Sequence, residues 1–327
     1  MASLVKRRIS GNDYFYLEKN IKLGPKKWKK VSVNIGRKQP DDKKLKEKNK
    51  ELNIKVERTL DELYGKNLDK YTFSFLSRKQ LIEIEKTKTN FLNRYKKLGK
   101  EQKEKFKKQQ TIDFVYTTLR TEGVNVESSD VETALKLLRK KRGESIMNEK
   151  VIISSLMISG YELLSNLQIC KPDFLKLHGI IMSYFEGKSP GQIRDDQRVI
   201  MRFNPKTFVQ EEINYRPPAP AQVEMEFEKF FDWFKQNKHV YPLELAALVH
   251  LKLYLIHPFK DGNKRMCRLL FNKILQDADY PMLNISKETS AYFSALIRSV
   301  EERTEKYFVE FCYKTFIEQV KNKRFFD

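Results

Sequence analysis

The apolar run LAALVHLKLYLI, which ends at Ile256, is followed immediately by HPFKDGNKR, residues 257–265. The run predicts an apolar helix. The nine residues after it concentrate a His, an Asp, a Gly-Asn pair and three cations. A hydrophobic core needs none of these side chains, and a random loop rarely collects them. The junction therefore predicts a helix that leads into a functional loop.

A second helix is predicted to begin near Lys264 or Arg265, directly after this loop. A helix N-terminus presents unpaired backbone N–H groups and the positive end of the macrodipole. Because Gly262-Asn263 tolerate unusual backbone angles, the loop and helix start can form a cradle for an anion. Arg265 and Arg268 are three residues apart and leave the same helix face, where they can hold successive phosphates.

Three other loop residues suggest a reaction at this cradle. Asp261 can hold a Mg²⁺ ion shared with the phosphates. His257 can take a proton from an incoming hydroxyl. Phe259 is expected to point inward and anchor the loop. Together these groups describe phosphate-ester chemistry on a nucleotide, with a base, a metal carboxylate, an anion cradle and a cationic clamp.

The stretch HPFKDGNKRMCR resembles the active-site motif of Fic-domain proteins, HxFx(D/E)GN(G/K)RxxR, and fills every fixed position. The helix before it and the segment after it are also similar to the family. SPGQIRDDQRVIM…RPPAPA resembles the β-hairpin flap that lies over the active site, at about residues 190–216. The resemblance covers roughly residues 111–318 and implies a mainly α fold, a Fic helical core with a short β-hairpin flap.

The resemblance implies a protein adenylyltransferase, an enzyme that transfers AMP from ATP to a Ser, Thr or Tyr hydroxyl of another protein or of itself. His257 would be the general base and Asp261 would bind Mg²⁺ between the α- and β-phosphates. The implied phosphate ligands are backbone N–H groups, the side chain of Asn263 at the α-phosphate, and two arginines at the β- and γ-phosphates: Gly262, Asn263, Lys264, Arg265 and Arg268.

Two further contacts follow from the resemblance. Flap strands near Val199–Met201 and Thr207–Val209 would pair with an extended target segment, with Val199, Ile200 and Met201 as the contacting residues. Tyr292 and Leu296 are the expected adenine-side residues.

Thr118-Leu-Arg-Thr-Glu122-Gly123 resembles the inhibitory motif of the family, (S/T)xxxE(G/N), placed before the core on a helix at about residues 114–124. The resemblance implies that Glu122 forms an ion pair with Arg268. A carboxylate at this position removes the partner of the γ-phosphate and adds a negative charge beside it. ATP would then bind weakly or unproductively.

Lys264 leaves two other activities open on the same fold. Most AMP-transferring members have Gly there, whereas the related Doc toxins have Lys and phosphorylate their target. Doc motifs lack the second arginine, which is present here as Arg268, so adenylylation is favoured over a Doc-like protein kinase. Removal of AMP from modified proteins, with Glu122 aligning a water, is the other alternative.

The formal net charge of +21 is concentrated at one end of the chain. Residues 1–110 hold 32 Lys and Arg against 14 Asp and Glu, while residues 111–327 hold 32 against 29. We expect a basic β-hairpin at 1–38, with strands YFYLEKNI and WKKVSVNI around Gly24-Pro25. A charged helical segment at 39–110 and the Fic domain at 111–327 would follow. The basic third suggests a nucleic-acid-binding regulator or an acidic partner; a well-solvated lysine-rich surface is the alternative.

The three cysteines, Cys170, Cys267 and Cys312, are widely spaced and form no CxxC pattern. That spacing argues against a disulfide framework or a zinc site and favours a reducing compartment. The chain has no N-terminal apolar segment typical of a signal peptide and no apolar stretch of about 18 residues. We expect a cytoplasmic protein without a membrane partner.

Overall fold

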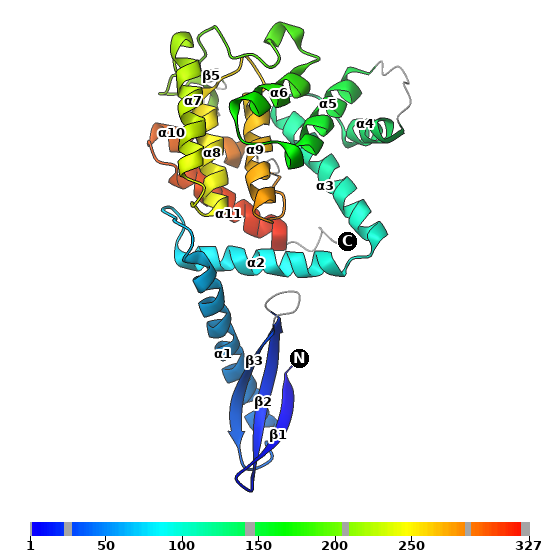
Figure 1. Ribbon diagram of the computed structural model, residues 1–327, viewed down its shortest axis with the longest axis vertical. Helices are drawn as coiled ribbons and strands as arrows, with labels where there is room; N and C mark the ends of the chain where they lie inside the picture. Colours follow the sequence, from blue (N-terminus) through cyan, green and yellow to red (C-terminus); the bar gives the residue numbers. More distant parts are fainter. Residues whose placement is uncertain (1, 23–27, 141–147, 205–208, 285–288, 322–327) are drawn as a thin grey trace. The chain divides into compact units, whose positions relative to one another are not determined.

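The computed structural model describes residues 2–22, 28–140, 148–204, 209–284 and 289–321 (Figure 1). The chain divides into two compact units, an N-terminal unit, Met1–Lys70, and a C-terminal unit, Tyr71–Asp327.

The N-terminal unit is a three-stranded antiparallel sheet followed by one helix. Its elements are β1 (Ser3–Ile9), β2 (Asn12–Lys22), β3 (Trp28–Gly36) and α1 (Asp42–Leu68), with the strands in the order β1-β2-β3. Buried side chains of β2 and β3 pack on α1 through Leu52 and Val56. The apolar residues of one sheet face and one helix stripe therefore form a small core.

The predicted hairpin strands YFYLEKNI and WKKVSVNI are confirmed as β2 and β3, which pair antiparallel. The sequence did not predict the third strand, β1. The strand SLVKRRI was missed because it shows no clear apolar–polar alternation. It pairs with β2 through a two-residue turn at Ser10-Gly11, where both residues have positive φ, 48° and 80°. This is the turn geometry that hairpins favour. The predicted turn at Gly24-Pro25 lies outside the described residues.

The predicted boundary between residues 110 and 111 falls inside a helix. α2 (Arg78–Lys97) and α3 (Lys100–Thr121) both belong to the C-terminal unit. The carboxylate of Glu244 accepts hydrogen bonds from the backbone N–H groups of Ser74, Phe75 and Leu76, at 2.7–3.1 Å. The predicted segment 39–110 is thus divided, because α1 packs on the sheet whereas α2 is fixed to the helical core.

The C-terminal unit is a helical core around one apolar helix, α8 (Pro242–Ile256), which packs against α7 (Pro220–Gln236), α9 (Asn263–Asp277) and α11 (Lys306–Lys321) (Figure 1). The remaining α-helices are α4 (Ser128–Lys140), α5 (Glu149–Leu163), α6 (Lys171–Met182) and α10 (Thr289–Glu301), and two 3-10 turns lie at Leu164–Asn166 and Glu186–Lys188. The mainly α fold is confirmed. No helix in the described ranges is long and apolar enough to cross a membrane.

A short hairpin, β4 (Met201–Asn204) with β5 (Val209–Glu212), lies where the flap was predicted. β4 begins two residues later than expected, so Val199 and Ile200 precede it. The preceding segment is held in an irregular conformation because the carbonyl of Asp196 accepts a hydrogen bond from Arg194. Thr207 and the predicted turn at Pro205 lie outside the described residues.

Candidate active site

The loop between α8 and α9 reverses the chain through two residues with left-handed backbones. His257 caps α8 with φ 50° and ψ 58°, and its N–H donates to the carbonyl of Leu253 at 3.0 Å. Gly262 precedes α9 with φ 76°. The predicted end of α8 at Ile256 is confirmed, and α9 begins at Asn263, one residue before the predicted start.

The imidazole of His257 is arranged as a neutral base. Its Nδ1 lies 3.2 Å from the carbonyl oxygen of Tyr254. Because a carbonyl only accepts, Nδ1 carries the proton and Nε2 keeps its lone pair. Burial lowers the pKa of His257 to about 4, and the nearby positive charges of Arg194 and Lys264 act in the same direction. Nε2 is thus free to take a proton at neutral pH.

The side chain of Asn263 closes the loop on itself. Its Oδ1 accepts from the N–H of Phe259 at 3.0 Å, and its Nδ2 donates to the carbonyl of Phe259 at 2.8 Å. The ring of Phe259 is fully buried, as predicted. The two side-chain hydrogen bonds use Oδ1 and one of the two N–H donors of Nδ2, and the expected contact of the Asn263 side chain with the α-phosphate stays a prediction. Its backbone N–H, in the first turn of α9, still faces no intrahelical acceptor.

His178 of α6 packs against the loop between α8 and α9, a role that the sequence did not predict. Its ring stacks on Phe259 with centroids 3.7 Å apart. Its Nδ1 accepts from the N–H of Gly191 at 2.9 Å, so Nε2–H donates to the carbonyl of Asp261 at 3.0 Å. Burial lowers the pKa of His178 to about 4. A lone histidine on an apolar helix gave no signal for this role.

Arg194 is a second residue that the sequence did not single out. The residue is 2% exposed, and its guanidinium donates to three carbonyls, those of His257 at 2.6 Å, Asp196 at 2.5 Å and Pro218 at 2.7 Å. Its own N–H donates to the carbonyl of Pro258 at 2.9 Å. Arg194 thus connects the two ends of the predicted flap, at Asp196 and Pro218, to the backbone of His257.

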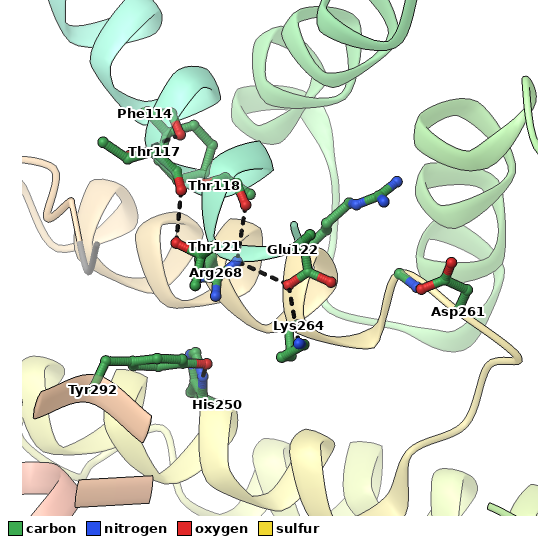
Figure 2. A network of polar contacts seen from close by, with 12 residues as sticks. Phe114, Thr117, Thr118, Thr121, Glu122, His250, Asp261, Lys264, Arg268 and Tyr292 are labelled. Atoms are coloured by element: carbon green, nitrogen blue, oxygen red, sulfur yellow. Dashed lines mark hydrogen bonds and ion pairs between the residues drawn. The ribbon is translucent and has the colours of Figure 1, made fainter. Parts of the chain in front are cut away.

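Glu122 and Arg268 form the ion pair that the sequence predicted (Figure 2). Arg268 Nη1 lies 3.1 Å from Glu122 Oε1, and the same nitrogen donates to the carbonyl of Thr118 at 3.3 Å. The two charged side chains are only 2% and 5% exposed. Lys264 Nζ lies 3.8 Å from the same carboxylate oxygen. One carboxylate therefore faces two cations of the motif.

The end of α3 explains why Glu122 is placed there. The N–H of Val124 donates to the carbonyl of Leu119, and that of Gly123 to the carbonyl of Arg120, both at 3.1 Å. This is a Schellman cap, with Glu122 at the C-cap and Gly123 in the left-handed region at φ 81°. The Glu-Gly pair thus ends the helix at the point where the carboxylate reaches α9.

Two buried guanidinium groups have donors that meet no hydrogen-bond partner among the described residues. In Arg268 these are Nε and Nη2, and in Arg265 the unpaired atom is Nε. Arg265 is 4% exposed, and its Nη1 meets only the sulfur of Met182, at 3.0 Å. Unpaired buried donors of a charged group are costly, and an anion satisfies them best. The first turn of α9 is therefore a fitting seat for phosphate.

Asp261 fits a shared Mg²⁺ site better than a self-contained one. One of its oxygens, Oδ1, accepts from the N–H of Gly262 at 2.6 Å. Among the described residues, no group of three or more His, Cys, Asp or Glu side chains is placed to hold a metal. Mg²⁺ commonly binds through one carboxylate together with water and substrate phosphates, so Asp261 next to a phosphate seat is sufficient.

Other predicted contacts are placed differently. Tyr292 and Leu296 are fully buried, so neither offers surface to adenine. The ring of Tyr292 lies under Arg268, 5.1 Å from its guanidinium carbon, and the tyrosine hydroxyl bonds to His250 at 3.0 Å. In the predicted flap, Val199 and Met201 are 44% and 43% exposed, whereas Ile200 is buried and anchors the segment.

Comparisons with known proteins agree on one family. Residues 168–275 match the profile of the Fic/DOC family. The chain is 27% identical over 210 residues to the protein adenylyltransferase Fic of Drosophila grimshawi, and 28% identical to that of Drosophila mojavensis. These alignments cover 63% of this chain but 41% and 39% of the relatives. The chain thus spans about two fifths of the length of the curated relatives it matches.

Two solved structures share the fold. A Fic domain containing signaling protein from Bacteroides thetaiotaomicron superposes with a TM-score of 0.59 at 20% identity, covering 73% of this chain and 94% of that protein. A Fic family protein from Desulfovibrio desulfuricans gives 0.61 at 19% identity, covering 77% and 74%.

Proposed function

Because the chain contains a Fic domain of the Fic/DOC family, we propose that it is a protein adenylyltransferase, a nucleotidyltransferase that moves AMP from ATP to a protein hydroxyl. The observation that carries this proposal is one loop–helix junction that holds both His257, whose Nε2 keeps its lone pair, and two buried arginines whose donors lack partners among the described residues. A base and a phosphate seat in one site are what transfer of a nucleotide to a hydroxyl requires.

In the proposed reaction the hydroxyl oxygen of a Ser, Thr or Tyr attacks the α-phosphorus of ATP. The new O–P bond forms as the bond to the bridging oxygen of the β-phosphate breaks, and pyrophosphate leaves. His257 Nε2 takes the hydroxyl proton. Arg265 and the N–H groups of Asn263 and Lys264 hold phosphate oxygens at the helix start. Asp261 would hold a Mg²⁺ ion, which neutralises charge on the phosphates.

Arg268 is assigned to the γ-phosphate, and its pairing with Glu122 makes the ground state inhibited. A carboxylate on Arg268 occupies the donor that the γ-phosphate needs and repels that phosphate. Lys264, 3.8 Å from the same oxygen, is withdrawn from the cradle as well. Release of Glu122 would therefore return two cations to the triphosphate. Thr118 and Gly123 help to hold this ion pair. The carbonyl of Thr118 accepts a hydrogen bond from Arg268, and Gly123 belongs to the cap that ends α3 at Glu122.

The protein substrate would enter along the flap. Val199, two residues before β4, and Met201, the first residue of β4, are exposed and apolar. An extended segment can add to the open edge of a two-stranded hairpin. The acceptor hydroxyl belongs to another protein or to the chain itself. Three free cysteines favour a reducing compartment, for which we propose the cytoplasm.

A second partner is proposed for the basic N-terminal third. With 32 Lys and Arg against 14 Asp and Glu, residues 1–110 carry most of the net charge. A charge excess of this size attracts nucleic acid or an acidic protein.

The test follows transfer of label from ATP labelled at the α- or the γ-phosphate. The wild type is compared with Glu122→Gly and with Glu122→Gly combined with His257→Ala, using the protein itself and a cell lysate as acceptors. Label from the α-position that appears in Glu122→Gly and vanishes without His257 supports adenylylation. Label from the γ-position alone identifies a Doc-like protein kinase. If no variant transfers label, release of AMP from modified proteins becomes the activity to assay.

A further inference from the structure

The sheet of the N-terminal unit has one face that α1 does not cover. Side chains alternate between the two faces of a strand, and Leu17, Ile21, Val31 and Val33 all pack toward α1. The residues between them, and those paired with them across the ladder, lie on the opposite face. The charged and aromatic residues of this outer sheet face are Arg7, Tyr14, Tyr16, Glu18, Lys22, Trp28 and Lys30.

Cations lie over aromatic rings on the outer sheet face. The guanidinium carbon of Arg7 is 5.0 Å from the centroid of Tyr16, and Lys22 Nζ is 5.7 Å from that of Trp28. Arg37, which follows β3, lies 5.2 Å from the ring of Tyr14 and donates to its hydroxyl at 2.9 Å. Such contacts hold long cationic side chains close to the sheet and reduce the entropy lost on binding an anion.

The outer sheet face has a strong excess of positive charge. Residues 1–38 contain eleven Lys and Arg and only two Asp and Glu. One acid, Glu18, lies on this face between Arg7 and Lys30, is 8% exposed, and forms ion pairs with both cations, so it orients them and offsets one of their charges. The other, Asp13, pairs with Lys6, whose side chain points to the opposite face. A ligand of this face meets cations and aromatic edges.

The dimensions of the face favour a duplex over a single strand. The axes of three strands spaced by about 4.8 Å span roughly 10 Å, which is comparable to the width of the B-DNA major groove, about 12 Å. A single strand binds chiefly by stacking its bases on open aromatic faces. Tyr14 and Tyr16 instead have cations over their rings.

We infer that the outer sheet face binds double-stranded DNA, with the sheet in the major groove and its cations on the phosphates. This inference narrows the partner proposed for residues 1–110 to one surface and one ligand. It does not depend on AMP transfer. Four cations, Arg7, Lys22, Lys30 and Arg37, lie on or beside this face and can reach phosphates, Arg7 and Lys30 by exchanging their contact with Glu18. At a slope of about −0.9 per contact, affinity should fall roughly 100-fold between 50 and 200 mM salt.

The test measures binding of the full chain to a fluorescent 30-base-pair duplex, to one of its single strands, and to polyglutamate of similar charge. Lys22→Glu combined with Lys30→Glu changes the charge of the outer sheet face. Lys46→Glu combined with Lys50→Glu makes the same change of net charge on exposed positions of α1, in the same unit. Circular dichroism checks that both variants fold.

We expect the duplex to bind tightest, with the predicted salt dependence. The sheet variant should lose at least 10-fold in affinity and the helix variant less than 3-fold. Equal losses in both variants would mean attraction by net charge only and would overturn the assignment to this face. Tighter binding of the single strand or of polyglutamate would overturn the duplex assignment. The sheet variant in the Glu122→Gly background should keep AMP transfer. Loss of DNA binding and loss of AMP transfer can therefore be told apart.

Discussion

The ring of His178 stacks on Phe259 with centroids 3.7 Å apart, and its Nε2 lies 3.0 Å from the carbonyl of Asp261. A histidine of α6 thereby fixes the backbone of the loop between α8 and α9. The hydrogen bond that Nδ1 accepts from Gly191 requires the neutral ring, because a protonated Nδ1 would face another donor.

His178 is predicted to make the fold sensitive to acid. Burial lowers its pKa from 6.5 to about 4, so the unfolded chain binds the proton more readily between these values. The contribution of neutral His178 to the free energy of unfolding is therefore fully present above pH 6.5 and is lost as the pH falls toward 4. Between pH 7 and pH 5 the loss is about 2 kcal/mol.

The measurement is urea unfolding of wild type and His178→Gln at pH 7 and pH 5. His178→Gln should be less stable at pH 7, because it loses the stacking and hydrogen bonds. The gap between the two proteins should narrow by about 2 kcal/mol at pH 5. A gap that does not change with pH would show that His178 is not held neutral in the fold.

Arg194 is predicted to act as a positioning residue for His257. Arg194→Met removes the donors to three carbonyls and one of the positive charges that lower the pKa of His257. In the Glu122→Gly background we expect transfer to fall at least 10-fold while ATP affinity changes little. The pKa of His257, measured by NMR titration, should rise toward 6.5. An unchanged pKa would reduce Arg194 to a structural contact.

Gly262 and Gly123 form a matched pair, since both have left-handed backbones, with φ 76° and 81°. A Cβ at Gly262 would lie 2.8 Å from Met182 Sδ, whereas one at Gly123 meets no atom within 4 Å. Gly123→Ala should cost only the backbone strain, about 1–2 kcal/mol. Gly262→Ala should cost about 1–3 kcal/mol more from overpacking. Thermal unfolding tests this, and equal losses would contradict the close contact.

His257 is predicted to give a pH–rate profile without a step near its ordinary pKa. Since burial holds its pKa at about 4, the ring is already neutral at pH 6. The kcat/KM of Glu122→Gly should therefore show no loss from protonation of His257 as the pH falls from 8 to 6. His257→Ala in that background should lose about 10²–10⁴-fold in rate. An acid limb with a midpoint near 6.5 would contradict the buried, neutral base.

The motif loop could be predicted from the sequence because its residues are contiguous. A loop between two helices fixes which residues lie at the helix start, and α9 does begin directly after Gly262, at Asn263. Glu122 is distant in sequence, and its pairing with Arg268 came from the resemblance to a known motif.

Contacts between distant segments without a motif were beyond the sequence. His178 and Arg194 reach the loop from α6 and from the segment before β4, and neither neighbourhood carries a pattern of its own. The same limit applies to α2, whose charged sequence predicted a separate segment. Its N-terminus is fixed by one buried carboxylate, Glu244, which lies far along the chain.

The central claim is that Glu122 inhibits AMP transfer by occupying Arg268. Its most direct test measures AMP incorporation from α-labelled ATP for wild type, Glu122→Gly, Arg268→Ala and the double variant. We predict that only Glu122→Gly is active, at least 10-fold above the others, because transfer needs Arg268 free of its carboxylate. Wild type as active as Glu122→Gly, or a double variant as active as Glu122→Gly, would contradict the account.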